Sequence, residues 1–160
     1  MTNGRTERRR WRGEGVVHRA LTLDAGSTLL FPEPSLGSVY AQRAAAYGIG
    51  IEPADAEKRF LHAWRKAHRN GGGDGLIFGT THEEALDFWR GVVSEVFHPS
   101  GASQETSEAL LRDLYREFGR GRRWRVNRGF ERLRRACRAA GLGLGLVSNW
   151  DRRLRGVLQD

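Results

Sequence analysis

The sequence predicts an α/β fold in which a partial parallel sheet is interrupted by a long helical segment. Residues 16–24 and 142–147 are short apolar stretches of the kind that forms buried strands. Between them, from residue 36 to about 118, apolar residues recur with the period of a helix. A further helical stretch at 128–140 directly precedes the second strand. The order strand, helix, strand is typical of a parallel α/β sheet.

The first predicted strand, VVHRALTLD at residues 16–24, ends at Asp24 and leads into a loop. Its β-branched and apolar residues favour a buried strand. The residues that follow it are loop formers: Gly26, Ser27, Pro32 and Pro34. Residues 1–15 are polar, rich in arginine and without periodicity, so we expect a disordered basic tail outside the fold.

Four helices are predicted between residues 36 and 118. The first covers residues 36–47, and the second has Pro53 in its first turn, where proline is well tolerated. The third begins at Thr81, whose hydroxyl can cap the helix while Glu84 reaches back to it. The fourth carries an apolar face, which consists of Leu110, Leu111, Leu114, Tyr115 and Phe118.

In the last part of the chain, the sequence predicts a helix, a strand, a turn and a final helix. Residues 128–140 form a fifth helix with one apolar side, and 142–147 form a second buried strand. Ser148, Asn149 and Trp150 then turn into a final helix opened by Asp151. Two parallel strands leave both edges of a sheet incomplete. We therefore expect these residues to be the N-terminal part of a larger domain.

The composition excludes several classes of protein. The chain has 160 residues, 39% of them apolar, which suits a globular fold. A single cysteine, Cys137, excludes a disulfide framework and any zinc site built from cysteines. No apolar run approaches the roughly 20 residues of a membrane span, and the N-terminus does not resemble a signal peptide. We expect a cytoplasmic protein that does not bind membranes.

The net charge of +8 is concentrated in arginine-rich stretches. Residues 112–138 hold eleven basic and three acidic side chains, whereas residues 20–111 hold seven and twelve. Trp124 and Phe130 lie among these arginines, so a nucleic-acid-binding module is one alternative. Phe130, however, falls on the apolar side of the fifth helix. A solvated helix face is therefore the favoured explanation, and nucleic acid is not the expected partner.

Polar residues follow both predicted strands. Ligands of open α/β sheets gather at the carboxyl ends of the strands, where this sequence places Asp24, Ser148 and Asn149. A carboxylate can ligate a metal or act as a nucleophile, and a hydroxyl and an amide can hold a phosphate. The alternative is that these residues only cap turns.

Taken together, the two strand ends resemble a known family. ALTLDAGSTLLF resembles the first motif, D-x-D-x-T-L, of the haloacid dehalogenase-like (HAD) hydrolases. GLGLGLVSNWDRRLRGVL resembles their second motif, in the SN-x-D form of the rhythmically-expressed-gene-2-like subgroup. The resemblance covers about residues 16–160. It implies a HAD-like Rossmannoid core made of 16–35 plus 122–160, with an inserted α-helical (C1-type) cap at 36–121.

The resemblance also implies residue roles. The protein would be a phosphatase- or dehalogenase-type hydrolase acting on a small phosphorylated or halogenated molecule. Asp24 matches the nucleophile, and with the backbone carbonyl of Gly26 it would ligate Mg²⁺. Ser148 matches the second-motif hydroxyl that binds the transferred group. Thr28 matches the motif threonine, and Asn149 would neighbour the same group.

Two departures from the family pattern lower the expected activity. Gly26 stands where many members carry a second aspartate that acts as general acid and base. The third motif, a basic residue, and the fourth, an acidic pair that completes the metal site, are absent from these residues. We expect weak Mg²⁺ binding and little or no turnover. A non-catalytic scaffold of the same fold is the remaining alternative.

Overall fold

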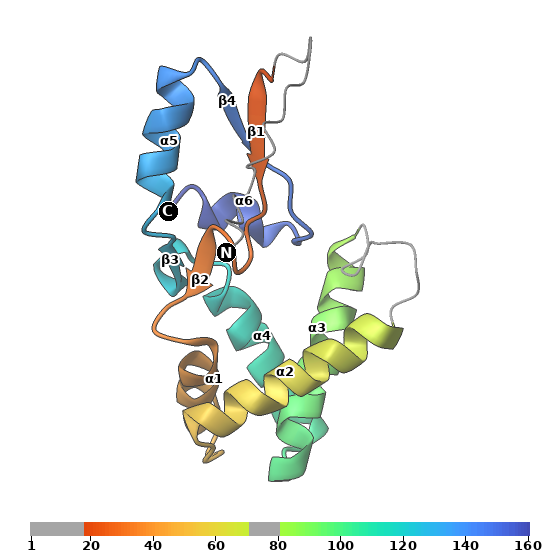
Figure 1. Ribbon diagram of the computed structural model, residues 1–160. Helices are drawn as coiled ribbons and strands as arrows, with labels where there is room; N and C mark the ends of the chain where they lie inside the picture. Colours follow the sequence, from red (N-terminus) through yellow and green to blue (C-terminus); the bar gives the residue numbers. More distant parts are fainter. Residues whose placement is uncertain (1–17, 71–80) are drawn as a thin grey trace, which may run out of the picture.

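The computed structural model describes residues 18–70 and 81–160, which form a mixed α/β structure. The predicted tail and residues 16–17 of the first predicted strand lie outside this range. A small parallel sheet lies at one end of the molecule, and four helices lie at the other (Figure 1). The carboxyl ends of the strands point toward these helices.

The parallel sheet consists of two strands, β1 (Ala20–Leu23) and β4 (Gly143–Leu146). The register pairs Ala20 with Gly143 and Leu23 with Leu146. One more hydrogen bond, from the Val147 amide to the Leu23 carbonyl at 2.9 Å, continues the pairing past the last strand residues. Both strands therefore end at the same edge of the sheet, as the predicted topology requires.

The expectation that both strands are buried was wrong for the described residues. Side chains of β1 alternate between exposed and half-buried, and most of β4 is exposed, with Leu144 at 36%. A parallel strand is enclosed only where layers cover both of its faces. Here α5 (Phe130–Ala139) packs beside β4, but within the described residues the two strands are not covered on both sides.

A short antiparallel ribbon connects the sheet to the helices. It pairs β2 (Leu30–Pro32) with β3 (Trp124–Val126), two segments that the sequence did not identify as strands. Each has only three residues, which is too short to show a strand period. The Glu33 amide donates to the Arg123 carbonyl at 2.8 Å and extends the ribbon.

The helical segment (residues 36–118) contains α1 (Leu36–Ala45), α2 (Pro53–Asn70), α3 (His82–Phe97) and α4 (Gln104–Glu117). The predicted capping box at the start of α3 is confirmed. The Thr81 hydroxyl accepts the Glu84 amide at 3.1 Å, and the Glu84 carboxylate accepts the Thr81 amide at 2.9 Å. The first helix ends at Ala45, two residues before the predicted end, and the Tyr47 side chain is exposed.

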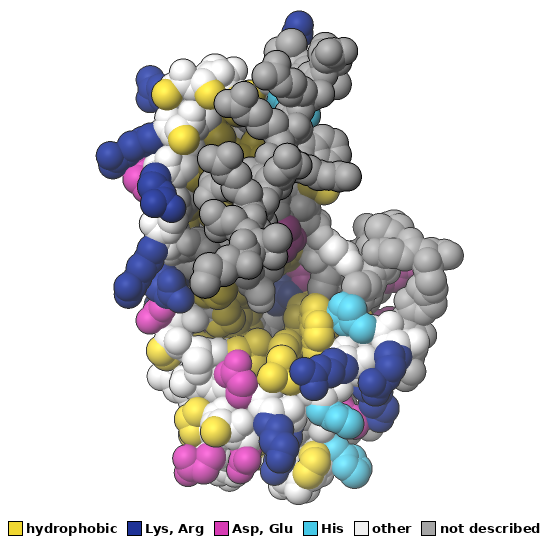
Figure 2. All heavy atoms as spheres, in the orientation of Figure 1, with side chains coloured by type: hydrophobic (Ala, Val, Ile, Leu, Met, Phe, Trp, Pro, Cys, Tyr) yellow, Lys and Arg dark blue, Asp and Glu magenta, His cyan; other side chains and the backbone are white. Residues whose placement is uncertain are grey.

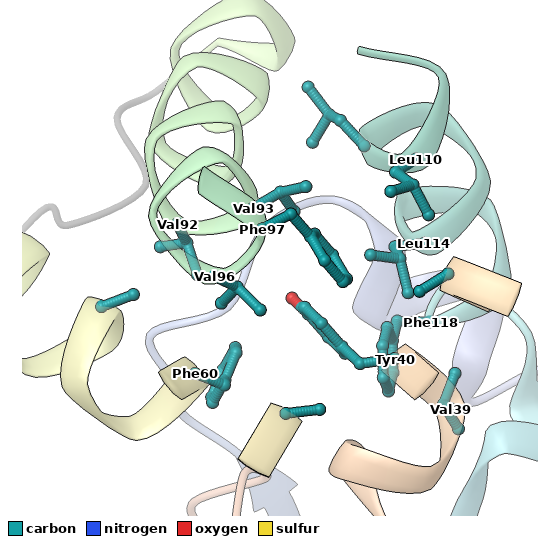
Figure 3. Packing of buried hydrophobic residues seen from close by; sticks show 14 residues of the cluster. Val39, Tyr40, Phe60, Val92, Val93, Val96, Phe97, Leu110, Leu114 and Phe118 are labelled. Atoms are coloured by element: carbon teal, nitrogen blue, oxygen red, sulfur yellow. The ribbon is translucent and has the colours of Figure 1, made fainter. Parts of the chain in front are cut away.

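One apolar core holds these four helices together. The ring of Tyr40 lies among Phe60, Phe97 and Phe118 (Figure 3), with ring centroids 5.5 to 6.0 Å apart. Aliphatic side chains of α1, α3 and α4 complete this core: Val39, Val92, Val93, Val96, Leu110 and Leu114. The helical segment thus has a dense core of its own.

Gly37 allows α1 and α2 to approach each other closely. A Cβ atom at this position would lie 2.1 Å from the Pro53 carbonyl oxygen, far inside contact distance. The Gly37 amide instead donates to the Glu57 carboxylate at 2.7 Å. A side chain at residue 37 would therefore force the two helices apart.

A smaller apolar cluster lies under the β1 turn. Ala25, Leu29 and Leu30 are buried together with Val157 of α6 (Arg153–Val157). Cys137 is a free, buried cysteine. None of the described helices is both long enough and apolar enough to cross a membrane.

Candidate active site

The turn after β1 brings Thr28 back to Asp24. The Ala25 carbonyl accepts the amides of Leu29 at 2.9 Å and Leu30 at 2.8 Å, which curls the chain tightly. Ser27 adopts the left-handed conformation (φ 59°) in this turn, an uncommon choice for a residue other than glycine. As a result the Thr28 hydroxyl donates to Asp24 Oδ2 at 3.2 Å.

Ser148 reaches the same carboxylate from the end of β4. Its hydroxyl donates to Asp24 Oδ1 at 2.6 Å, although the two residues are 124 positions apart in sequence. The parallel register explains this contact, since it aligns the residues that follow the two strands. Each carboxylate oxygen of Asp24 thus accepts a hydrogen bond from one hydroxyl, and these two bonds fix the orientation of the carboxylate.

A cavity of about 530 Å³ leads from this carboxylate toward the helical segment. The end beside the carboxylate is lined by predicted site residues: Asp24, Gly26, Ser148 and Asn149. Rings dominate the remaining wall, among them Tyr40, Phe60, Tyr115, Trp124 and Trp150. Hydrophobic side chains gather in the space-filling view between the sheet end and α2 (Figure 2). The volume lies within the usual range for small-molecule sites.

Trp150 lies over Gly26, where the family pattern has a second aspartate. A Cβ atom at residue 26 would sit 3.6 Å from the Trp150 ring, an ordinary contact. Trp150 in turn packs edge-on against Trp124, with centroids 4.7 Å apart. The surface beside Asp24 is therefore aromatic at the position where an acid would otherwise stand.

A buried ion pair joins the region after β4 to the helical segment. The Asp151 carboxylate accepts the Trp89 indole N–H at 2.9 Å and the Arg153 guanidinium at 2.6 Å. The Arg153 guanidinium also lies over the rings of Trp89 and Tyr115, 4.9 and 3.9 Å from their centroids. Residues far apart in sequence are thereby linked across the cavity wall.

The pKa of Asp151 reflects this pairing. Burial by itself would raise it, but the hydrogen bonds and charge of Arg153, with the Trp89 N–H, lower it below the ordinary value. Asp151 was predicted only to open the last helix, and it does accept the Arg153 amide at 3.0 Å. Its partner Trp89 lies 62 residues away, and no local sequence pattern signals such a contact.

The donors for a metal ion are sparse. Within residues 18–70 and 81–160, no group of three or more His, Cys, Asp or Glu side chains is placed to hold a metal. The candidate donors are the Asp24 carboxylate and the Gly26 backbone carbonyl. Mg²⁺ commonly uses only one or two protein carboxylates and completes its shell with water and substrate phosphate. These two groups therefore fit part of a magnesium site.

Many arginines of the 112–138 stretch are paired within the protein. Buried Glu117 forms ion pairs with arginines from α1 and from the connection to β3, namely Arg43, Arg120, Arg122 and Arg123. Hydrogen bonds from Arg134 and Arg135 lower the pKa of Glu131 to about 2. These contacts give part of the arginine-rich stretch an internal role.

Several curated proteins similar to this chain carry the same name. The sequence matches no family model. It is 37% identical to haloacid dehalogenase-like hydrolase domain-containing protein 3 of Homo sapiens over 141 residues, 88% of this chain and 55% of that protein. The Xenopus tropicalis protein of the same name is 32% identical over 137 residues, 85% of this chain and 71% of the relative. The Rhythmically expressed gene 2 protein of Drosophila melanogaster is 26% identical over 151 residues, 89% of this chain and 56% of that protein.

The small parallel sheet, with a carboxylate and a hydroxyl at one edge, is compatible with a Rossmann-like α/β protein. The sequence comparisons narrow this class further. The chain belongs to the haloacid dehalogenase-like hydrolase family, as the two motifs predicted. It spans about half the length of most of the curated relatives that it matches.

Proposed function

We propose that Asp24 is the nucleophile of a phosphoryl-transfer hydrolase. The observation that carries this proposal is the 2.6 Å hydrogen bond from Ser148 to Asp24 at the mouth of a ligand-sized cavity. Nothing in the fold requires a carboxylate and a hydroxyl to meet there, and carboxyl ends of parallel strands are where such sites form. Membership of a hydrolase family supports the same reading.

The two hydroxyls would orient Asp24 for attack. A carboxylate has about four acceptor positions, so lone pairs remain after Thr28 and Ser148 each donate one hydrogen bond. One oxygen forms a bond to phosphorus while the bond to the leaving oxygen breaks, and the leaving group departs with the electron pair and takes a proton from water. Water then attacks phosphorus, which releases inorganic phosphate and regenerates the carboxylate. In the intermediate, Ser148 and Asn149 would face the transferred group.

Mg²⁺ is the cofactor we propose for this site. When bound, it offsets the negative charge of the phosphoryl oxygens. Asp24 and the Gly26 carbonyl would hold it. Because the described residues contain no group of three or more His, Cys, Asp or Glu side chains that could hold a metal, we expect weak binding in this chain.

The helical segment would form the body of a cap with the boundaries 36–121. Its wall residues and Asp24 line one cavity, so the cap would enclose the substrate and keep water from the nucleophile. The Asp151 to Trp89 contact would hold the cap against the strand ends.

A non-catalytic HAD-fold scaffold is the second candidate. Gly26 favours it, because residue 26 offers no acid to protonate a leaving oxygen. A dehalogenase, whose halide leaving group needs no proton, would also tolerate glycine here. Chemical trapping with a phosphoryl donor separates the phosphoryl-transfer nucleophile from both of these alternatives.

The test is phosphorylation of Asp24. The chain is incubated with Mg²⁺ and either acetyl phosphate or p-nitrophenyl phosphate, and the reaction is quenched in acid. The protein is then digested, and the masses of its peptides are measured by mass spectrometry. We expect a phosphoryl adduct on the Asp24 peptide that Asp24→Asn abolishes. Asp87→Asn, which alters an exposed carboxylate of α3, is the matched control and should leave labelling unchanged.

Turnover gives a second readout. Hydrolysis of p-nitrophenyl phosphate that disappears in Asp24→Asn would support the nucleophile. Measurable wild-type hydrolysis that continues at the same rate in the variant would contradict it. A chain that binds phosphonates but never becomes labelled would be the scaffold.

A further inference from the structure

Aromatic rings make up much of the cavity wall around Asp24. Trp150 covers Gly26, and Trp124 packs edge-on against Trp150 at 4.7 Å. Tyr115 lies farther along the same cavity, under the Arg153 guanidinium. A group attached to a reacting centre at Asp24 would therefore meet flat apolar surfaces first.

Three charged or ionisable side chains on this wall, Glu57, His68 and Arg153, already have partners inside the protein. The Glu57 carboxylate accepts the Gly37 amide at 2.7 Å. The His68 ring bonds to the Trp64 carbonyl at 3.0 Å. The Arg153 guanidinium, one-tenth exposed, is paired with Asp151. These groups have limited capacity left to bind a ligand.

A polyhydroxylated ligand would lose hydrogen bonds in such a cavity. Hydroxyls that leave water without new partners cost free energy, and the faces of aromatic rings supply few such partners. An aromatic ring gains from the same transfer and can pack edge-on or in an offset stack on tryptophan. A volume of about 530 Å³ has room for a fused two-ring group together with a phosphoryl group.

We propose that the substrate carries a flat aromatic group next to its reacting phosphoryl group, and that Trp150 is a specificity residue for it. The class is aryl phosphates as opposed to sugar phosphates. This inference rests on the proposed function, because it takes Asp24 as the point of attachment.

Binding of non-hydrolysable probes tests the inference without any turnover. Isothermal titration calorimetry compares 1-naphthylphosphonate, methylphosphonate and the methylene phosphonate analogue of glucose 6-phosphate on the wild-type chain. We expect the naphthyl probe to bind on the order of tenfold more tightly than the other two. Equal affinities, a preference for the sugar analogue, or no naphthyl binding at millimolar concentration would overturn the proposal.

Three variants test whether Trp150 is responsible for the preference for the naphthyl probe. Trp150→Ala should remove most of it, whereas Trp150→Phe, which keeps a ring, should retain most of it. Tyr47→Ala removes an exposed ring that does not line the cavity and should change nothing. If Trp150→Ala loses its fold by circular dichroism, Leu61→Asn replaces it, because Leu61 lines the cavity yet is 43% exposed. Leu61→Asn should weaken naphthyl binding several-fold, and unchanged binding in that variant would count against the proposal.

The two proposals fail separately. A naphthyl preference without an adduct on Asp24 would contradict only the nucleophile. An adduct on Asp24 with equal probe affinities would contradict only the aromatic substrate class.

Discussion

The helical segment and the parallel sheet differ sharply in how deeply their side chains are buried. Around Tyr40 and Phe97 the helices bury an aromatic and aliphatic core that water barely reaches. In the sheet, Leu144 is 36% exposed, and Val147, directly after β4, is 69% exposed. The helices are therefore stabilised by packing, whereas hydrogen bonds at the strand ends position Asp24. Stability and the proposed chemistry reside in different parts of the described chain.

The largest expected effect comes from the helical core. Phe97 is fully buried and stacks on Tyr40 at 6.0 Å. Phe97→Ala should lower the free energy of unfolding by about 3–5 kcal/mol, through lost burial and the cavity left behind. Urea denaturation followed by circular dichroism measures it. A loss below about 1 kcal/mol would mean that this core does not dominate stability.

An intermediate effect is expected at the contact between the two regions. Asp151→Asn keeps the size of the side chain but removes the charge that pairs with Arg153, whose side chain is itself mostly buried. We expect a loss of about 2–3 kcal/mol at neutral pH. Asp87→Asn, on an exposed carboxylate, should stay near zero.

The same pair predicts a pH dependence. Because the folded-state pKa of Asp151 is lowered, its stabilisation is complete above the unfolded-state pKa of about 3.9 and is lost as pH falls through the folded value. Wild type should therefore lose stability in acid more steeply than Asp151→Asn. If the free energy of unfolding fell equally with decreasing pH in the two proteins, the pair would contribute nothing to stability.

The smallest effect is expected in the sheet. Leu144 of β4 is exposed, so Leu144→Ala should cost about 0.5 kcal/mol or less. The same urea titration measures this difference. A loss as large as that of Phe97→Ala would show that β4 is covered in solution and would remove the contrast between the two regions.

The sequence predicted local and periodic features well. The order of the helices and the capping box at Thr81 are confirmed, since each follows from residues near one another in the chain. The ribbon of β2 and β3 was missed because three-residue strands carry no period. Burial of β1 and β4 was predicted wrongly, because apolar composition does not reveal which layers cover a strand.

The candidate site divides in the same way. Parallel topology was enough to place Asp24 near Ser148, and the structure has them in contact. The roles of Asp24, Gly26, Thr28, Ser148 and Asn149 stay predictions. The contacts of Asp151 with Trp89 and of Trp150 with Gly26 depend on how the helical segment docks. No spacing or motif encodes that docking.

The β2 and β3 ribbon makes the helical segment exchangeable. The chain leaves for the helices at Glu33 and returns at Arg123, and these two residues are already hydrogen-bonded at 2.8 Å. A very short linker could bridge that gap with little loop-closure entropy. Recombination at these two points could thus replace one insert by another while the strand ends stay in place, which offers a route by which a lineage could change its ligands and keep its chemistry.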